Sequence, residues 1–157
     1  MDTSKKIFVL GYGRSGTSVM GRILGNHPDI FMFRELNFFE KIWDRRVNQE
    51  LSEQKAVKLA TQLVGQQNRS IDMIKDLAEF EDEAREIVAG IQANALTPLE
   101  VYEEFLNATT VKHGKSIPCV QTPGFGFYIP EILQLFPEGW IINMVRDPRD
   151  NLYARKY

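Results

Sequence analysis

The sequence has very little cysteine: Cys119 is the single thiol among 157 residues. One cysteine excludes an internal disulfide and fits a reducing compartment, because disulfide frameworks belong to oxidising ones. We interpret Cys119 as a small core residue, because its sequence neighbours include no base that would activate a nucleophile. Neither His27 nor His113 has a partner at metal-ligand spacing, so the sequence predicts no metal site.

Long apolar runs and runs of one charge are also absent. No stretch approaches the roughly 20 apolar residues of a membrane span, so none is predicted. Residues 1–6 lead directly into the first predicted strand, which predicts no signal peptide and a cytoplasmic location. The net charge of −2 argues against a nucleic-acid or anionic-membrane partner. Attraction for an anionic ligand must therefore be local, with Arg14, Arg146 and Arg149 as its sources.

The most informative stretch covers residues 7–24. Residues 7–10 are apolar and favour a β-strand, and an apolar helical face follows, formed by Val19, Met20, Ile23 and Leu24. Three glycines lie between them: Gly11, Gly13 and Gly16. A strand, a glycine turn and a helix start form an anion site, because the backbone and the free helix N–H groups can approach the ligand closely. Arg14 adds a positive charge, and Thr17 and Ser18 add hydroxyls.

Three families use a loop of this kind. The nucleoside-triphosphate pattern G-x-x-x-x-G-K-[ST] fits both outer glycines, but Thr17 stands where the lysine is expected. The dinucleotide pattern G-x-G-x-x-G fits all three glycines, and Glu35 lies about 20 residues farther on, where a ribose-binding acid is expected. Residues 11–18 also closely resemble the phosphosulfate loop of sulfotransferases, with Arg14 in the place of its usual lysine or arginine. An ordinary strand-to-helix turn is the simplest alternative, although it gives the exposed polar cluster no role.

A second candidate segment follows the next predicted strand. Residues 25–28 are a helix stop, and residues 29–33 are short and apolar, which predicts a strand parallel to the first and paired with it. Ligands of open α/β sheets bind beyond the carboxyl ends of the strands, so Glu35 should face the glycine loop. Residues 34–39 resemble the Lys-Glu-x-His-Phe-Phe segment of carbohydrate sulfotransferases, whose glutamate is the catalytic base. Asn37 replaces the histidine, and the alternative is a surface Glu35 paired with Arg34.

Residues 40–112 are polar, charged and rich in helical spacing, which predicts a helical insertion with breaks at residues 65–68 and 94–98. The resemblance implies that acceptor-binding helices lie in this interval. Residues 115–122 then predict a strand, residues 125–136 a helix and residues 140–145 another strand. Gln121, at the end of the first of these, stands where the family often has a lysine near the reacting sulfate.

The last candidate segment is residues 145–153. Asp147 can cap a helix and Pro148 suits its first position, so a helix is predicted to start at the end of a strand. The order Arg-Asp-Pro-Arg-Asp resembles the 3′-phosphate motif of sulfotransferases, in which Arg146 would grip the phosphate. Ala154 occupies the place of a serine that normally also touches it. Surface Arg–Asp pairs are the alternative, but two phosphate-type motifs with an acid between them are uncommon by chance.

Together these patterns predict one α/β domain over residues 1–157, with a central parallel sheet in a three-layer arrangement like that of P-loop NTPases. The resemblance implies a sulfotransferase that uses 3′-phosphoadenosine 5′-phosphosulfate (PAPS), no metal, and a small-molecule or carbohydrate acceptor with a hydroxyl or amine. It implies Glu35 and Arg14 as catalytic residues. The donor-binding residues that it implies are Gly13, Arg14, Ser15, Gly16, Thr17, Ser18 and Arg146.

Sulfotransferases usually continue for roughly another hundred residues, within the normal size of one domain. We therefore expect this chain to be a C-terminally truncated member. The alternatives are a P-loop nucleotide kinase or NTPase, a non-catalytic nucleotide-binding fragment and, last, a dinucleotide-binding domain.

Overall fold

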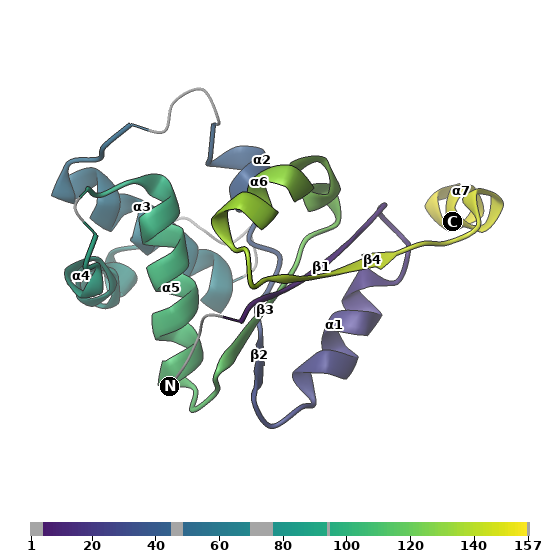
Figure 1. The fold of residues 1–157 in the computed structure, drawn as a ribbon, viewed down its shortest axis with the longest axis horizontal. Helices are drawn as coiled ribbons and strands as arrows, with labels where there is room; N and C mark the ends of the chain where they lie inside the picture. The colour runs from purple at the N-terminus through teal and green to yellow at the C-terminus, as the bar shows by residue number, and fades with distance from the viewer. Residues whose placement is uncertain (1–4, 45–48, 70–76, 94, 157) are drawn as a thin grey trace.

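The computed structural model describes residues 5–44, 49–69, 77–93 and 95–156. Within them, four parallel strands form one sheet in the order β2-β3-β1-β4. The strands are β1 (Ile7–Gly11), β2 (Ile30–Met32), β3 (Ile117–Gln121) and β4 (Trp140–Met144). Helices cover both faces of the sheet (Figure 1). The predicted α/β class with a central parallel sheet is therefore confirmed.

The strand order corrects one prediction and weakens one alternative. Strand β3 lies between β1 and β2, so the predicted pairing of β1 with β2 is wrong, although both run parallel in the same sheet. Strand β1 is one of the two inner strands of the sheet. All five of its residues are buried, as expected for a parallel strand covered on both faces. Dinucleotide-binding sheets have the order 3-2-1-4, in which the second strand neighbours the first. The observed order therefore argues against a dinucleotide-binding domain.

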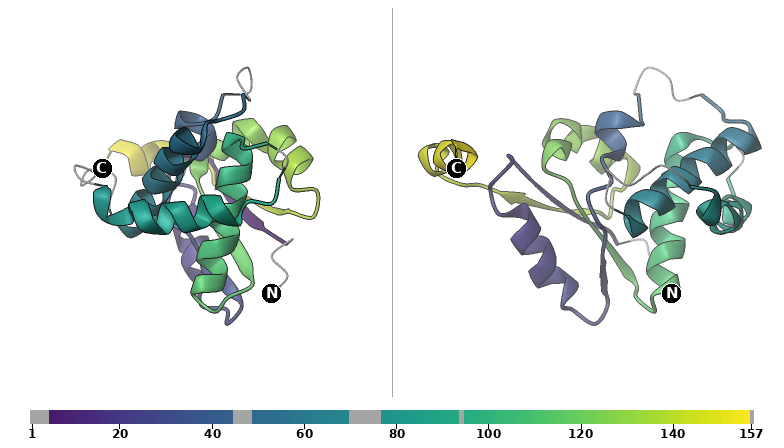
Figure 2. Two further views of the ribbon diagram at one scale, coloured as in Figure 1. Left: turned by 90° about the vertical axis from the view of Figure 1, so that its left-hand side faces the viewer. Right: turned by 180° about the vertical axis from the view of Figure 1, so that it is seen from behind.

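The helices form two unequal layers. Helix α1 (Thr17–Gly25) packs on one face, and the other face carries α3 (Glu53–Asn68), α4 (Glu81–Gly90), α5 (Pro98–Lys112) and α6 (Ile129–Leu135) (Figures 1 and 2). The short α2 (Phe38–Lys41) and the 3₁₀ helices η2 (Ala78–Phe80) and η3 (Pro123–Tyr128) complete that layer. Alternate β1 residues serve the two layers: Phe8 and Leu10 join the large core, whereas Ile7 and Val9 face α1.

Helix α1 has the predicted position, but its buried face differs from the predicted one. Met20 and Leu24 pack against the sheet, whereas Val19 and Ile23 are 60% and 59% exposed. Gly21 instead lies close to strand β2, because a Cβ atom on this glycine would be 2.3 Å from the end of the Met32 side chain. Apolar spacing therefore identified the helix without identifying its contact face.

The helical insertion is present, with different boundaries. Helix α3 runs through Gly65, so the predicted break at residues 65–68 is wrong; the glycine instead makes room for Leu77, which a Cβ atom would approach to 2.5 Å. In the second predicted break, Asn94 lies outside the described residues. Helix α5 then starts after Thr97, whose hydroxyl accepts a hydrogen bond from the backbone N–H of Glu100. The helix predicted from residue 125 begins only at Ile129, because η3 precedes it.

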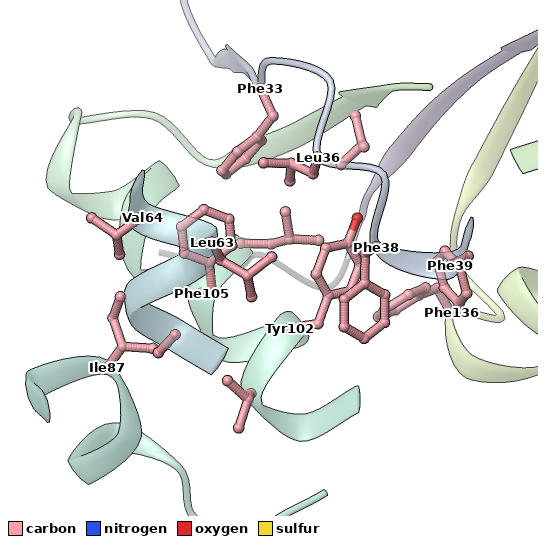
Figure 3. Close-up of a cluster of buried hydrophobic side chains, with 14 of the residues drawn as sticks. Phe33, Leu36, Phe38, Phe39, Leu63, Val64, Ile87, Tyr102, Phe105 and Phe136 are labelled. Carbon is pink, nitrogen blue, oxygen red and sulfur yellow. The ribbon is translucent and has the colours of Figure 1, made fainter. Parts of the chain in front are cut away.

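The segment that follows β2 is anchored in the large core. Leu36, Phe38 and Phe39 have no exposed surface, and the Phe38 ring stacks on Tyr102 with centroids 4.0 Å apart and planes 6° apart. Figure 3 shows Leu36 and Phe38 directed toward residues of α3 and α5, and Phe39 beside Phe136. This packing fixes the backbone around Glu35, whose side chain remains on the surface.

Candidate functional site

The glycine loop between β1 and α1 has an unusual backbone. Three of its residues have positive φ angles: Gly11 (153°), Arg14 (69°) and Gly16 (94°). The turn is closed by a hydrogen bond from the Ser15 N–H to the Tyr12 carbonyl at 3.0 Å. A left-handed conformation is unfavourable for a residue as large as arginine, and such strain concentrates at functional sites. The strained backbone therefore makes Arg14, whose side chain is exposed, a candidate functional residue.

The start of α1 has the features of an anion site. Its N-cap, Gly16, provides no side-chain cap, and its first turn contains no acidic residue. The first N–H groups of a helix have no partner within the helix, and the helix dipole adds positive potential there. Thr17 is buried at this position and Ser18 is exposed. The arrangement favours an anionic group bound by the backbone at the start of α1.

Arg146 lies beside this loop. It follows β4, and β4 pairs directly with β1, so the two strand ends are adjacent. The Arg146 guanidinium donates a hydrogen bond to the carbonyl oxygen of Arg14 at 3.0 Å. A guanidinium has five N–H donors, so others remain for a ligand. The two segments singled out from the sequence therefore meet at one place.

Helix α7 (Pro148–Lys156) begins where predicted. Asp147 Oδ1 accepts a hydrogen bond from the Arg149 N–H at 2.8 Å, and the Arg149 guanidinium contacts Asp147 Oδ2 at 2.7 Å. These bonds from Arg149 hold the pKa of the exposed Asp147 carboxyl below its usual value. The carboxylate is thus engaged with Arg149, while Arg146 is turned toward the glycine loop.

The sequence patterns did not identify Asn151, which connects α7 to the loop. Its side-chain Nδ2 donates to the Gly13 carbonyl at 2.8 Å and to Ser15 Oγ at 3.4 Å. The sequence did contain one signal for Asn151, its position about one turn after Pro148. A helix that starts at the end of a strand turns that position toward the loop. A cavity of about 430 Å³ lies between the loop and the β4–α7 junction, and Tyr12 and Arg146 are among its lining residues.

Gln121 also contacts the loop. It ends β3, is 7% exposed, and donates through Nε2 to Thr17 Oγ1 at 3.2 Å. The residue that replaces the expected lysine therefore lies next to the anion site, in a position to act on it through Thr17.

Glu35 follows β2 at the same edge of the sheet. Partial burial raises the pKa of its carboxyl above the usual value; the negative charge of Glu40 adds to this, and Lys41 opposes it. With the Asn37 amide nitrogen turned toward the carboxylates, Asn37 donates to Glu35 Oε1 at 3.2 Å and to Glu40 Oε2 at 3.0 Å. Sequence reasoning missed Glu40, whose carboxylate lies against Gly124 in space that a Cβ atom would fill. A raised pKa makes Glu35 a stronger base than an ordinary surface carboxylate.

The strand order determines how the candidate site residues are arranged along the edge of the sheet. From β2 to β4 the order is Glu35, Gln121, the glycine loop and Arg146. Neighbouring strands lie about 4.8 Å apart, so the strands that carry Glu35 and the loop are separated by about 10 Å. The edge thus presents a possible base, a hydrogen-bond donor, an anion loop and a cation in a row.

The described residues contain no group of three or more His, Cys, Asp or Glu side chains placed to hold a metal ion. None of the helices described has the length and apolar character needed to cross a membrane. A larger cavity of about 840 Å³ lies between α3 and α4, but Leu77 in its lining directly follows the undescribed residues 70–76, so it supports no site.

Comparison with known protein families gave a match. A family model described as the sulfotransferase family matches residues 6–157, which is almost the whole chain. No curated protein matches the chain.

Proposed function

This chain belongs to the sulfotransferase family, and on that premise we propose that it transfers a sulfuryl group from PAPS to an acceptor hydroxyl or amine. The observation that carries the proposal is the hydrogen bond from the Arg146 guanidinium to the Arg14 carbonyl. This contact brings the exposed, charged guanidinium of Arg146 to the side of a helix start that has no side-chain cap. A donor that carries a phosphosulfate and a 3′-phosphate needs two neighbouring anion-binding groups, which here are the start of α1 and the Arg146 guanidinium.

The order of groups along the sheet edge supports the same donor. The glycine loop lies between Arg146 on one side and Gln121 and Glu35 on the other. In PAPS the 5′-phosphosulfate lies between the nucleoside 3′-phosphate and the acceptor that attacks the sulfur. The separation of about 10 Å between the strands of Glu35 and the loop leaves room for the sulfuryl group and the acceptor atom.

In this proposal the backbone of Gly13, Arg14, Ser15, Gly16, Thr17 and Ser18 holds the 5′-phosphosulfate. The Arg14 side chain neutralises the charge that develops on the bridging oxygen as the sulfur–oxygen bond breaks. Arg146 binds the 3′-phosphate and thereby distinguishes the donor from ATP, which lacks that group. Fixed donors of this kind hold both ends of the nucleotide before the reaction begins.

Glu35 is the proposed general base. The acceptor oxygen or nitrogen forms a bond to sulfur, its proton passes to the Glu35 carboxylate, and 3′,5′-ADP leaves with the electron pair of the broken bond. The raised pKa of Glu35 favours this proton transfer, while Asn37 keeps the carboxylate in place through its hydrogen bond. A P-loop kinase or NTPase is disfavoured because Thr17 stands in the place of its phosphate-binding lysine.

The test is PAPS turnover, followed as release of 3′,5′-ADP in the presence of a panel of phenols, sugars and amines. We expect at least one acceptor to be sulfated, and Glu35→Gln to lower transfer by about a hundredfold or more while donor binding is kept. Glu138→Gln, at an exposed carboxylate in the turn before β4, is the matched control and should retain full turnover. Wild-type turnover in Glu35→Gln would remove Glu35 as the base. Donor binding without transfer to any acceptor would favour the non-catalytic alternative.

A further inference from the structure

Two amide side chains lie directly behind the hydroxyls of the glycine loop. Gln121 Nε2 donates to Thr17 Oγ1 at 3.2 Å, from the end of β3. Asn151 Nδ2 donates to Ser15 Oγ at 3.4 Å and to the Gly13 carbonyl at 2.8 Å, from α7. Both amides are buried, with 7% and 5% of their residue surface exposed. The hydroxyls of Thr17 and Ser15 are therefore each contacted from the protein side by an NH₂ group.

The direction of these bonds determines what the hydroxyls can do. A hydroxyl has one proton to donate and two lone pairs, whereas an amide nitrogen can only donate. In its contact with Gln121, Thr17 Oγ1 must therefore act as the acceptor, and its own proton is left for another partner. The Thr17 methyl group lies on the Gly11 side, 3.2 Å from where a Cβ atom on that glycine would be. No acceptor for the Thr17 proton is found among the described residues.

We propose that Gln121 and Asn151 are positioning residues, which hold the hydroxyls of Thr17 and Ser15 as hydrogen-bond donors to an anionic group in the glycine loop. This inference rests on the proposed function, in which the group is the 5′-phosphosulfate of the donor. A hydroxyl that donates to an anion makes a charge-assisted bond, which is about twice as strong as a neutral one.

The arrangement also accounts for Gln121 in place of a lysine. The glutamine provides no charge to the anion, but it keeps the Thr17 proton directed away from β3. An acceptor side chain at position 121 would have the opposite effect, because it would take that proton for itself. Position 121 thus requires a donor rather than merely a polar residue.

The test is a double-mutant cycle between Gln121 and Thr17, with 3′,5′-ADP binding measured by isothermal titration calorimetry. Gln121→Met preserves the length of the side chain and removes its N–H groups. We expect it to weaken binding of 3′,5′-ADP by about fivefold to thirtyfold, and binding of 5′-AMP by the same factor, because both share the 5′-phosphate. In a Thr17→Val background the same substitution should change affinity by less than about twofold. Gln121→Lys, which restores a donor, should bind at least as tightly as wild type.

Asn151→Leu with Ser15→Ala forms a second, independent cycle, which decides the question if Gln121→Met does not fold. If the two losses in a cycle simply multiply in the double variant, the positioning role is overturned while the donor site stands. Wild-type protein that binds neither nucleotide overturns the proposed function, and this inference with it.

Discussion

The substitution Gly11→Ala adds a Cβ atom at the point where β1 lies against β4. Gly11 is paired with Met144, and its φ of 153° is one that L-residues rarely adopt. A Cβ atom at this position would lie 2.7 Å from the Met144 carbonyl oxygen and 3.1 Å from its Cβ atom. The nearest atom belongs to backbone, so the clash cannot be relieved by turning a side chain. One strand must therefore move away from the other.

The expected destabilisation follows from two contributions. A strained backbone conformation costs about 1–3 kcal/mol, and forcing extra atoms into a packed region costs about 1–3 kcal/mol more. Their sum, about 2–6 kcal/mol, corresponds to a fall in Tm of about 4–24 °C for a domain of this size. Binding of 3′,5′-ADP should weaken as well, because the moving Met144 carbonyl is only two residues from Arg146.

The assay is thermal unfolding followed by circular dichroism. Gly126→Ala is the matched control, because an added Cβ atom there meets nothing within 4 Å among the described residues. If Gly11→Ala unfolds within about 2 °C of Gly126→Ala, the close approach of β1 to β4 at this point is wrong.

Three further predictions concern buried or charged groups. Glu40→Gln removes a negative neighbour and should lower the pKa of Glu35 toward its ordinary value; a carboxyl-carbon NMR titration that finds it unchanged would contradict the assigned cause. Glu103→Gln removes the carboxylate 2.8 Å from the buried Lys6 ammonium and should lower stability in urea by about 1–3 kcal/mol, whereas no loss would show that this ion pair is not stabilising. Burial raises the pKa of Cys119 to about 12, so a thiol reagent at pH 8 should label the folded protein about a hundredfold more slowly than the denatured one, and equal rates would show the thiol to be accessible.

Local signals predicted much of the secondary structure and the two loop segments. The apolar run before Gly11 forms β1, and the Asp147-Pro148 pair begins α7, because strand burial and helix capping depend on adjacent residues. The meeting of the two segments also followed, since parallel strands end at one edge of a sheet. The roles given to individual residues there stay predictions.

Non-local packing explains what the sequence did not reveal. The insertion of β3 between β1 and β2 depends on pairing between residues that lie far apart in the sequence, such as Ile7 with Cys119 and Ile30 with Ile117, for which the chain carries no local signal. The same holds for Gln121 and Asn151, whose partners in the glycine loop lie 104 and 136 or more residues away. Gly65 was misread as a break because a glycine required for close packing against Leu77 resembles one that ends a helix.

The central claim is that the glycine loop and Arg146 hold opposite ends of one nucleotide. Isothermal titration of 3′,5′-ADP and 5′-AMP tests it directly, because these ligands differ only in the 3′-phosphate. One charge-assisted hydrogen bond from Arg146 to that phosphate predicts a preference of about 10–100-fold for 3′,5′-ADP. Arg146→Met should abolish the preference, whereas Arg149→Met, at an exposed arginine paired with Asp147, should keep it. Equal affinity of the wild-type protein for both nucleotides would contradict the account.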